Sequence, residues 1–388
     1  MFADDMVLFT TDQKSLQAQL DSLYIYSVKW GLKINIDKTK ICIFRKRKQN
    51  IDFQWYINDA PVETVNSFCY LGVKFNCNGA LSEAIKALSD QALKAVNGLY
   101  SLFSSLKFDV KTKLTLFDRM VEPILLHCAE VWGVYDTSCL DRIHMKFCKR
   151  ILGVKMQTPN MAVLGELGRY PLSILCKERV LKYWLKLVNN PDSIMTDIFR
   201  DQCNNVNSPR CTNWPKYVKT LLEQLGYGYL WNHIAPNINY FPMLQKRLRD
   251  QFIQEWHGSI TNMPKLEYYS RFKTLFMFEP YLTNVDNDYL RKLLSCFRMS
   301  SHCLAIETGR YSGIARDQRI CQNCNLNVIE SEYHVLLTCP KYKNLRSKYL
   351  PKTSWPNLKM FDNLLSSAKK KVQWNICKYL KEIYLLRV

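Results

Sequence analysis

The sequence has 388 residues, 47% hydrophobic and 23% charged, so it can bury a large core, and its composition is not that of a disordered chain. Lysine and arginine outnumber aspartate and glutamate by 54 to 34; the net charge of +20 favours a polyanionic partner such as nucleic acid, although many basic proteins bind no particular partner. The N-terminus lacks the order of a signal peptide and no apolar run is long enough to cross a bilayer, so we expect a nuclear or cytoplasmic protein with reduced cysteines and no membrane association.

The first 79 residues are predicted to combine short strands with one helix. Four apolar or alternating runs are typical of strands, namely residues 6–9, 32–36, 41–44 and 68–75, the last as a strand or hairpin. Apolar residues at helical spacing between Leu16 and Trp30 predict the helix. Thr11 or Asp12 can cap its start, and Gly31 can end it in the left-handed conformation.

From about residue 80 the pattern of apolar residues changes to that of helices. One stripe runs from Leu81 to Leu102, and a second runs from Leu114 to Cys128 after Asp109, a possible cap. The last 28 residues of the sequence, counted from Phe361, predict a basic amphipathic helix.

Two adjacent carboxylates, Asp4 and Asp5, lie at a predicted turn between apolar residues. Their repulsion is relieved either by solvent, as in an ordinary acidic turn, or by a divalent cation. Mg²⁺ binds one or two carboxylates together with phosphate oxygens, and polymerases use two such ions to activate a 3′-hydroxyl. Both interpretations remain open from the pair alone.

Three motifs follow one another in this region: Phe2-Ala3-Asp4-Asp5, then Gly31-Leu32-Lys33-Ile34-Asn35 running into Asp37-Lys38-Thr39-Lys40, then Tyr70-Leu71-Gly72-Val73. Their order resembles the last part of the palm of a reverse transcriptase of the non-LTR retrotransposon (LINE) type. The resemblance implies that Asp4, with Asp5 beside it, binds catalytic Mg²⁺, and that Lys38 neutralises or protonates the departing pyrophosphate. It also implies that the hairpin containing Tyr70 and Gly72 grips the primer end. By spacing alone, Lys38 is better explained as a surface lysine.

The spacing Cys-x₂-Cys-x₉-His-x₄-Cys connects four residues, Cys321, Cys324, His334 and Cys339. The close cysteine pair is typical of a zinc knuckle, in which turn amides donate to sulfur, and Asn325 can adopt the left-handed conformation that such a turn often needs. His334 and Cys339 would lie about 140° apart on an ideal helix, but Pro340 favours ending the helix there and lets Cys339 turn back. The pattern predicts a closed, structural Zn²⁺ site; the alternative is unrelated buried thiols and a core histidine.

Two basic clusters are candidate contacts for nucleic-acid phosphates: Arg45-Lys46-Arg47-Lys48 and Lys369-Lys370-Lys371. Each has aromatic residues nearby that can stack on bases, namely Phe53, Trp55 and Tyr56 for the first and Trp374 and Tyr379 for the second. A solvated charge run or a nuclear-localisation patch fits each cluster equally well. Because no base-reading element is evident, we expect nonspecific binding.

Later segments, residues 123–133, 149–153 and 165–171, resemble the thumb of non-LTR elements and the region beyond it. The resemblance implies an RNA-directed DNA polymerase, a nucleotidyltransferase that uses an RNA template and a DNA primer or target. It implies an α+β fold in which a partial palm of short β-hairpins plus one helix precedes a mainly α-helical thumb and tail with a small zinc knuckle. The expected parts are a partial palm (1–79), a helical thumb and following segment (80–200), a helical linker region (201–300), a zinc-binding knuckle (301–345) and a basic C-terminal helix (346–388).

The resemblance begins inside the family's catalytic domain, and we find no match to the fingers or to the motif with the first catalytic aspartate. Without that aspartate one side of a two-metal clamp is missing, so we expect the chain as written to be inactive alone. Three interpretations stay open: a fragment of a polymerase, a non-catalytic zinc-containing nucleic-acid-binding protein derived from the element, or a non-functional product whose incomplete sheet aggregates.

Overall fold

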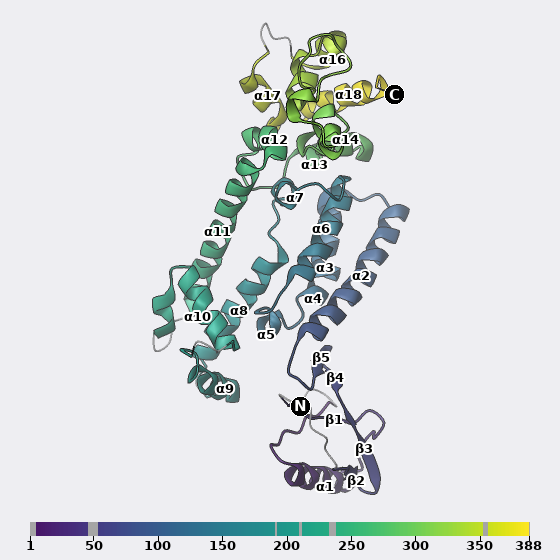
Figure 1. Ribbon diagram of the computed structural model, residues 1–388. Coiled ribbons are helices and arrows are strands. Elements are labelled where there is room, and N and C mark those ends of the chain that lie inside the picture. Colours follow the sequence, from purple (N-terminus) through teal and green to yellow (C-terminus); the bar gives the residue numbers. More distant parts are fainter. Residues whose placement is uncertain are drawn as a thin grey trace. The chain divides into compact units, whose positions relative to one another are not determined.

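The structure is a computed structural model that describes residues 5–45, 53–190, 192–208, 212–232, 238–351 and 356–387. Over these ranges it is mainly helical with a few small sheets, which agrees with the expected α+β class (Figure 1). The chain divides into two compact units, Met1–Leu88 and Ser89–Val388, and each is described by itself.

The first unit contains two small sheets. The strands are β1 (Lys40–Cys42), β2 (Trp55–Ile57), β3 (Ala60–Val65), β4 (Ser67–Tyr70) and β5 (Val73–Asn76). In the first sheet the order is β1-β3-β2, with β1 parallel and β2 antiparallel to β3. In the second, β4 and β5 form an antiparallel hairpin that pairs Phe68 with Phe75 and Tyr70 with Val73. The hairpin predicted over residues 68–75 is therefore confirmed.

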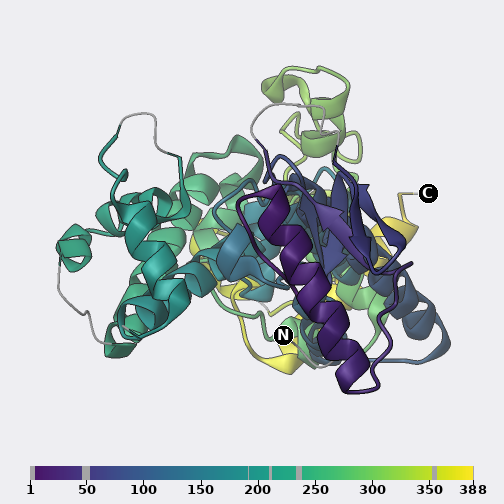
Figure 2. The same cartoon turned by 90° about the horizontal axis from the view of Figure 1, so that it is seen from below.

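Helix α1 (Gln13–Lys29) forms as its local sequence predicts. The carboxylate of Asp12 accepts a hydrogen bond of 2.8 Å from the amide of Ser15, so Asp12 is the cap. At the other end Gly31 has a φ of +63°, and the amide of Leu32 donates to the carbonyl of Ser27 at 2.8 Å. The helix packs beside the strands of its unit, where it is the purple helix of Figure 2, and buries Leu20 in the core of this unit.

Two of the predicted strands are absent. Residues 6–9 and 32–36 are irregular, and β1 covers only part of the run 41–44. The apolar alternation of 32–36 reflects burial without strand pairing, because Ile34 and Ile36 pack against the core while Lys33 and Asn35 are exposed. The carbonyl of Asn35 instead accepts from the amide of Thr39 at 3.0 Å in a turn.

The remaining chain is helical over its described ranges. Its first half contains α2 (Ser82–Ser105), which crosses the unit boundary, α3 (Val110–Met120), α4 (Glu122–Leu125), α5 (Ala129–Trp132), α6 (Ser138–Leu152), α7 (Asn160–Leu167), α8 (Leu172–Val188), α9 (Ile194–Cys203) and α10 (Trp214–Gln224). The second half contains α11 (Phe241–Asn262), α12 (Glu267–Phe272), α13 (Tyr281–Asn284), α14 (Asp288–Arg298), α15 (Ala305–Tyr311), α16 (Lys343–Tyr349), α17 (Leu358–Leu365) and α18 (Lys370–Leu385).

The stripe predicted from Leu114 to Cys128 is split into α3 and α4. Asp109 caps α3 as expected, because its carboxylate accepts from the amide of Thr112 at 2.9 Å. The break occurs at Val121, and Pro123 then lies in the first turn of α4. Proline has no amide hydrogen and clashes with the preceding turn, so it begins a new helix instead of continuing the old one.

A buried ionic network connects distant parts of the second unit. Arg298 of α14 donates to both carboxylate oxygens of Glu166 in α7 at 2.9–3.2 Å, and the Glu166 side chain is fully buried. Arg298 also lies 2.8 Å from the carboxylate of Glu279 and donates to the carbonyl of Leu365. Lys273, itself buried, pairs with Glu279. Two cations thus neutralise two carboxylates between α7, α14 and the end of α17.

Candidate metal centre and nucleic-acid contacts

The four predicted metal ligands lie together in the second unit. The ligand atoms of Cys321, Cys324, His334 and Cys339 are all within 4.8 Å of one another. A tetrahedron with metal–sulfur bonds of about 2.3 Å has edges of about 3.8 Å, so this spacing suits one ion. The Sγ atom of Cys324 is 3.5 Å from Nε2 of His334. The cluster can therefore hold a metal, and three thiolates with one imidazole suit structural Zn²⁺.

The first cysteine pair lies on a short hairpin. Ile320 and Ile329 form an antiparallel bridge, and the amide of Cys321 donates to the carbonyl of Val328 at 2.9 Å. The amide of Asn323 donates to the sulfur of Cys321, as expected of a knuckle. The expectation for Asn325 was wrong, because Asn327 has the positive φ, at 54°. The reason is that the sharp reversal of the hairpin comes later in the chain, immediately before Val328.

The second pair is brought together by a π-helical turn over His334–Thr338. The amide of Cys339 donates to the carbonyl of His334 at 2.8 Å, a bond between residues five apart. This wider turn brings residues five apart to the same side, which an α-helix does not do. Cys339 has the extended backbone typical of a residue before proline, so the helix ends at Pro340 as predicted. The amide of Lys341 donates to the sulfur of Cys339.

Thr338 contacts His334 through its hydroxyl in a way that favours one tautomer of the imidazole. Its hydroxyl lies 3.3 Å from the carbonyl of His334, to which it donates, and 3.0 Å from Nδ1 of the same residue. When the hydroxyl donates to the carbonyl, its oxygen accepts from Nδ1, an arrangement that uses the tautomer with the hydrogen on Nδ1. Nε2 is then left with a lone pair facing Cys324. Burial also lowers the pKa of His334, which favours the neutral imidazole that a metal needs.

Burial disfavours ionisation of two of the three thiols in the cluster. Burial raises the pKa of Cys321 to about 12, and burial raises the pKa of Cys339 as well. A bound divalent cation reverses this preference because it stabilises the thiolate directly. The site therefore combines ligands of the right chemistry with burial that keeps Cys321 and Cys339 protonated until a metal binds.

The C-terminal helix packs against this centre, as Figure 1 shows for α18 beside α14 and α16. Arg387 donates to both oxygens of Glu330 at 2.5 and 2.9 Å, and Glu330 also accepts from the side-chain amide of Asn323 at 3.1 Å. Burial opposes ionisation of Glu330, but the hydrogen bonds from Arg387 lower its pKa. The hydroxyl of Tyr379 donates to the carbonyl of Val335 at 2.6 Å. Sequence reasoning did not identify the supporting roles of Arg387, Glu330 and Tyr379. It also missed Thr338, which only its i, i+4 spacing from His334 could have indicated.

Most predicted polymerase residues in the first unit lie at the surface. Asp4 lies outside the described residues, while Asp5 and Lys38 are exposed. The backbone amide of Lys38 donates to the side chain of Asn35 at 3.1 Å. Tyr70 and Gly72 lie at the β4–β5 turn, in which Leu71 has a φ of 47° and Gly72 one of 80°. Positive φ at both central residues matches a tight two-residue hairpin turn.

Only Arg45 of the first basic cluster lies within the described residues, whereas all three lysines of the second do. Of the first, Lys46, Arg47 and Lys48 lie outside the described residues, and the amide of Arg45 donates to the carbonyl of Cys77 at 2.8 Å. Lys369, Lys370 and Lys371 are exposed at the start of α18, which has no side-chain cap and no acidic residue in its first turn.

Two of the aromatic residues expected to stack on bases are buried. Tyr379 is fully buried and Trp55 is 2% exposed, and the indole of Trp55 donates to the carbonyl of Gln13 at 3.1 Å. Both rings belong to the apolar faces of their elements, which pack inward. Tyr56, at 43% exposed, keeps an accessible ring.

No family model matches the chain. A protein of Caenorhabditis elegans, whose name describes it as uncharacterized and transposon-derived, is 25% identical over 229 residues, which is 56% of this chain and 78% of the relative. This similarity supports an origin in a transposable element. None of the helices in the described ranges is both long and apolar enough to span a membrane.

Proposed function

We propose that this chain is part of a non-LTR retrotransposon reverse transcriptase, an RNA-directed DNA polymerase. In this proposal the second unit, including the C-terminal helix α18, binds the nucleic acid. The observation that carries the proposal is the closed Cys₃His cluster, because it follows motifs that resemble that family in their order along the chain. The similarity to a transposon-derived protein supports the same origin.

In this proposal the two metals have different roles. Zn²⁺ is structural, because four protein ligands leave no open coordination position for a reacting water. Asp4 and Asp5 are assigned to Mg²⁺ in the intact polymerase, where that ion supplies charge stabilisation for nucleotide transfer, and the exposure of Asp5 suits this assignment. Lys38 is assigned to the leaving pyrophosphate, and the turn of Tyr70 and Gly72 to the primer.

The start of α18 is assigned to nucleic-acid phosphates. Lys369, Lys370 and Lys371 place like charges at the end of a helix where the macrodipole is also positive. An anion relieves both repulsions, and the net charge of +20 attracts a polyanion from a distance. RNA template, DNA primer and target DNA all offer such phosphates, so the proposed binding has little sequence preference.

The test is binding of RNA and DNA by the full, zinc-loaded chain as a function of salt. For duplex DNA the logarithm of affinity should fall linearly with the logarithm of salt, with a slope of about 0.9 per neutralised phosphate. Replacing all three lysines of the α18 cluster by alanine should weaken binding to every sequence and reduce the slope by up to about three times that amount. A control removes equal charge from three exposed lysines elsewhere, Lys182, Lys186 and Lys246.

The control variant should keep most of the wild-type slope. If wild type binds neither RNA nor DNA, the proposed function is wrong. Equal losses in the two variants would show that net charge, and not the α18 cluster, determines binding.

A further inference from the structure

A second basic and aromatic cluster lies in the second unit, apart from the lysines of α18. Tyr311, the last residue of α15, is 53% exposed. The ammonium groups of Lys155 and Lys265 lie 5.7 and 5.6 Å from the centre of its ring, and Lys265 also donates to the Tyr311 hydroxyl at 3.3 Å. Residues far apart in sequence therefore place two cations beside one accessible ring.

The charges of this cluster are only partly neutralised. Lys155 donates to the carbonyl of His302 at 3.1 Å, and the nearby Lys149, which is buried, donates to the carbonyl of Met156 at 2.7 Å. A carbonyl satisfies the hydrogen bond but leaves the charge. Burial lowers the pKa of Lys149, and the positive charge of Lys265 lowers it further, so these two lysines repel each other.

One carboxylate, that of Glu307, serves two cations of the cluster. It pairs with Lys265 and lies 3.3 Å from Nε of Arg310. With the neighbouring pocket included, the five cations Lys149, Lys155, Lys265, Arg310 and Arg316 face the three carboxylates of Glu267, Glu307 and Glu332, an excess of two positive charges. An anion is therefore the favoured ligand at Tyr311.

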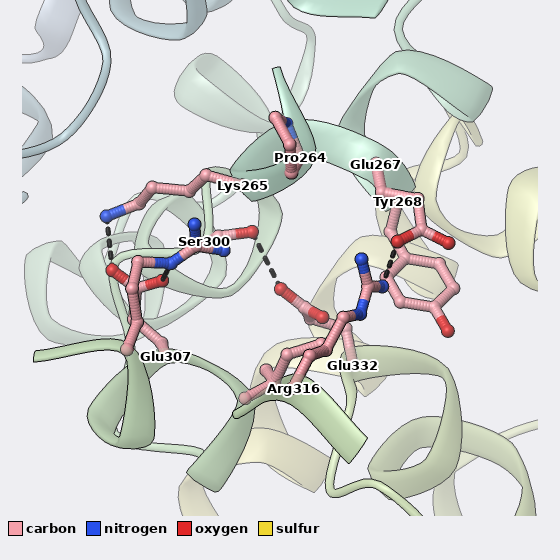
Figure 3. Close-up of a pocket in the computed structure, with 10 residues that line it drawn as sticks. Pro264, Lys265, Glu267, Tyr268, Ser300, Glu307, Arg316 and Glu332 are labelled. Atoms are coloured by element: carbon pink, nitrogen blue, oxygen red, sulfur yellow. Dashed lines mark hydrogen bonds and ion pairs between the residues drawn. The ribbon is translucent and has the colours of Figure 1, made fainter. Parts of the chain in front are cut away.

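The neighbouring pocket does not compete for that anion (Figure 3). Lys265 reaches toward Glu307, Arg316 toward Glu267, and Ser300 donates to Glu332 at 2.7 Å. One carboxylate oxygen of the buried Glu332 has no hydrogen-bond partner, so the pocket interior repels anions. Beside the Tyr311 ring, the accessible positive charge is that of the exposed Lys155.

We infer that Tyr311, with Lys155, binds a nucleotide of single-stranded nucleic acid, whose base stacks on the exposed ring while the exposed Lys155 contacts its phosphate and Lys265 adds positive charge beside the ring. Stacking explains why the cluster surrounds an exposed aromatic side chain, and the lysines explain the preference for a charged backbone. The inference rests on the proposed function, and adds to it a second site that distinguishes single strands from duplexes, because paired bases cannot leave their stack without cost.

The experiment measures binding of the full, zinc-loaded chain to oligo(dT) and to a DNA duplex of the same length. Tyr311→Ala should weaken binding to the single strand by about 5- to 150-fold, the loss of one base–aromatic stack, and change duplex affinity by less than about twofold. Tyr311→Phe keeps the ring and should bind the single strand nearly as wild type. Lys155→Ala should reduce the single-strand salt slope by about 0.7.

The matched control is Tyr289→Ala, because Tyr289 is 52% exposed on α14. If wild type binds nucleic acid and Tyr311→Ala behaves like Tyr289→Ala, the inference is wrong while the proposed function stands. An equal loss of single-strand and duplex binding by Tyr311→Ala also overturns it, because stacking would not be the cause. If wild type binds neither ligand, the proposed function itself fails. Zinc content measured on each variant reports whether the fold is kept.

Discussion

Replacing Thr338 by valine tests how the π turn prepares the metal centre. The change keeps the shape of the side chain and removes the oxygen that lies 3.0 Å from Nδ1 of His334, where it is placed to accept a hydrogen bond. Without that acceptor the ring can exchange tautomers or rotate, so Nε2 no longer faces Cys324 in every molecule. Partners of this kind typically contribute 10- to 100-fold to metal affinity, or about 1.4–2.8 kcal/mol.

Competition with a chromophoric zinc chelator at fixed pH measures this loss. Thr338→Ser retains the hydroxyl and should bind zinc almost as tightly as wild type. Thr338→Val should be weaker by the stated factor, with unfolding of the metal-free forms nearly equal. Zinc affinity in Thr338→Val as high as in wild type would refute the reasoning that this hydroxyl fixes the histidine.

Three further outcomes are expected. Zinc affinity should rise by about three powers of ten per pH unit near neutrality, because the thiols of Cys321, Cys324 and Cys339 must each release a proton on binding, and burial raises the pKa of Cys321 and of Cys339; a pH-independent affinity in the same chelator assay would contradict this. Arg298→Met should lower the free energy of unfolding by about 3–5 kcal/mol in denaturant titrations, because it leaves the buried Glu166 unpaired. The control Arg200→Met, which removes an exposed pair with Asp197, should lower it by less than about 1 kcal/mol. The 388-residue chain alone should incorporate nucleotides only at background on a primed RNA template with Mg²⁺, because we find no third catalytic carboxylate motif in it; templated incorporation would show that this requirement is met some other way.

Features set by neighbouring residues were predictable from the sequence. The cap of α1 at Asp12 and its end at Gly31 depend on contacts within a few residues, and both are present. The cluster that could hold a metal was also predictable, because cysteines and a histidine at knuckle spacing carry their chemistry in their identity. In contrast, the strand predicted over residues 32–36 is absent, because a strand requires a partner that the alternation of apolar residues does not specify.

The environment of each candidate residue was less predictable. Tyr379 was expected to stack on bases, yet α18 turns its apolar face inward and the Tyr379 hydroxyl bonds to Val335. The π turn that aligns His334 with Cys339 has no clear sequence signal, since Pro340 predicts only where the helix ends. The cluster around Tyr311 combines residues more than 150 positions apart, from Lys149 to Tyr311, and depends on the packing of the whole unit.

The contacts between α18 and the metal centre have a consequence for biosynthesis. During translation all four ligands are made before Tyr379 and Arg387, which complete the surroundings of the centre. A polypeptide that stops before Tyr379 therefore carries every zinc ligand, yet leaves Glu330 and the carbonyl of Val335 without these partners. Such a product keeps the four candidate ligands of the metal but lacks the end of α18, whose contacts hold the segments that carry them.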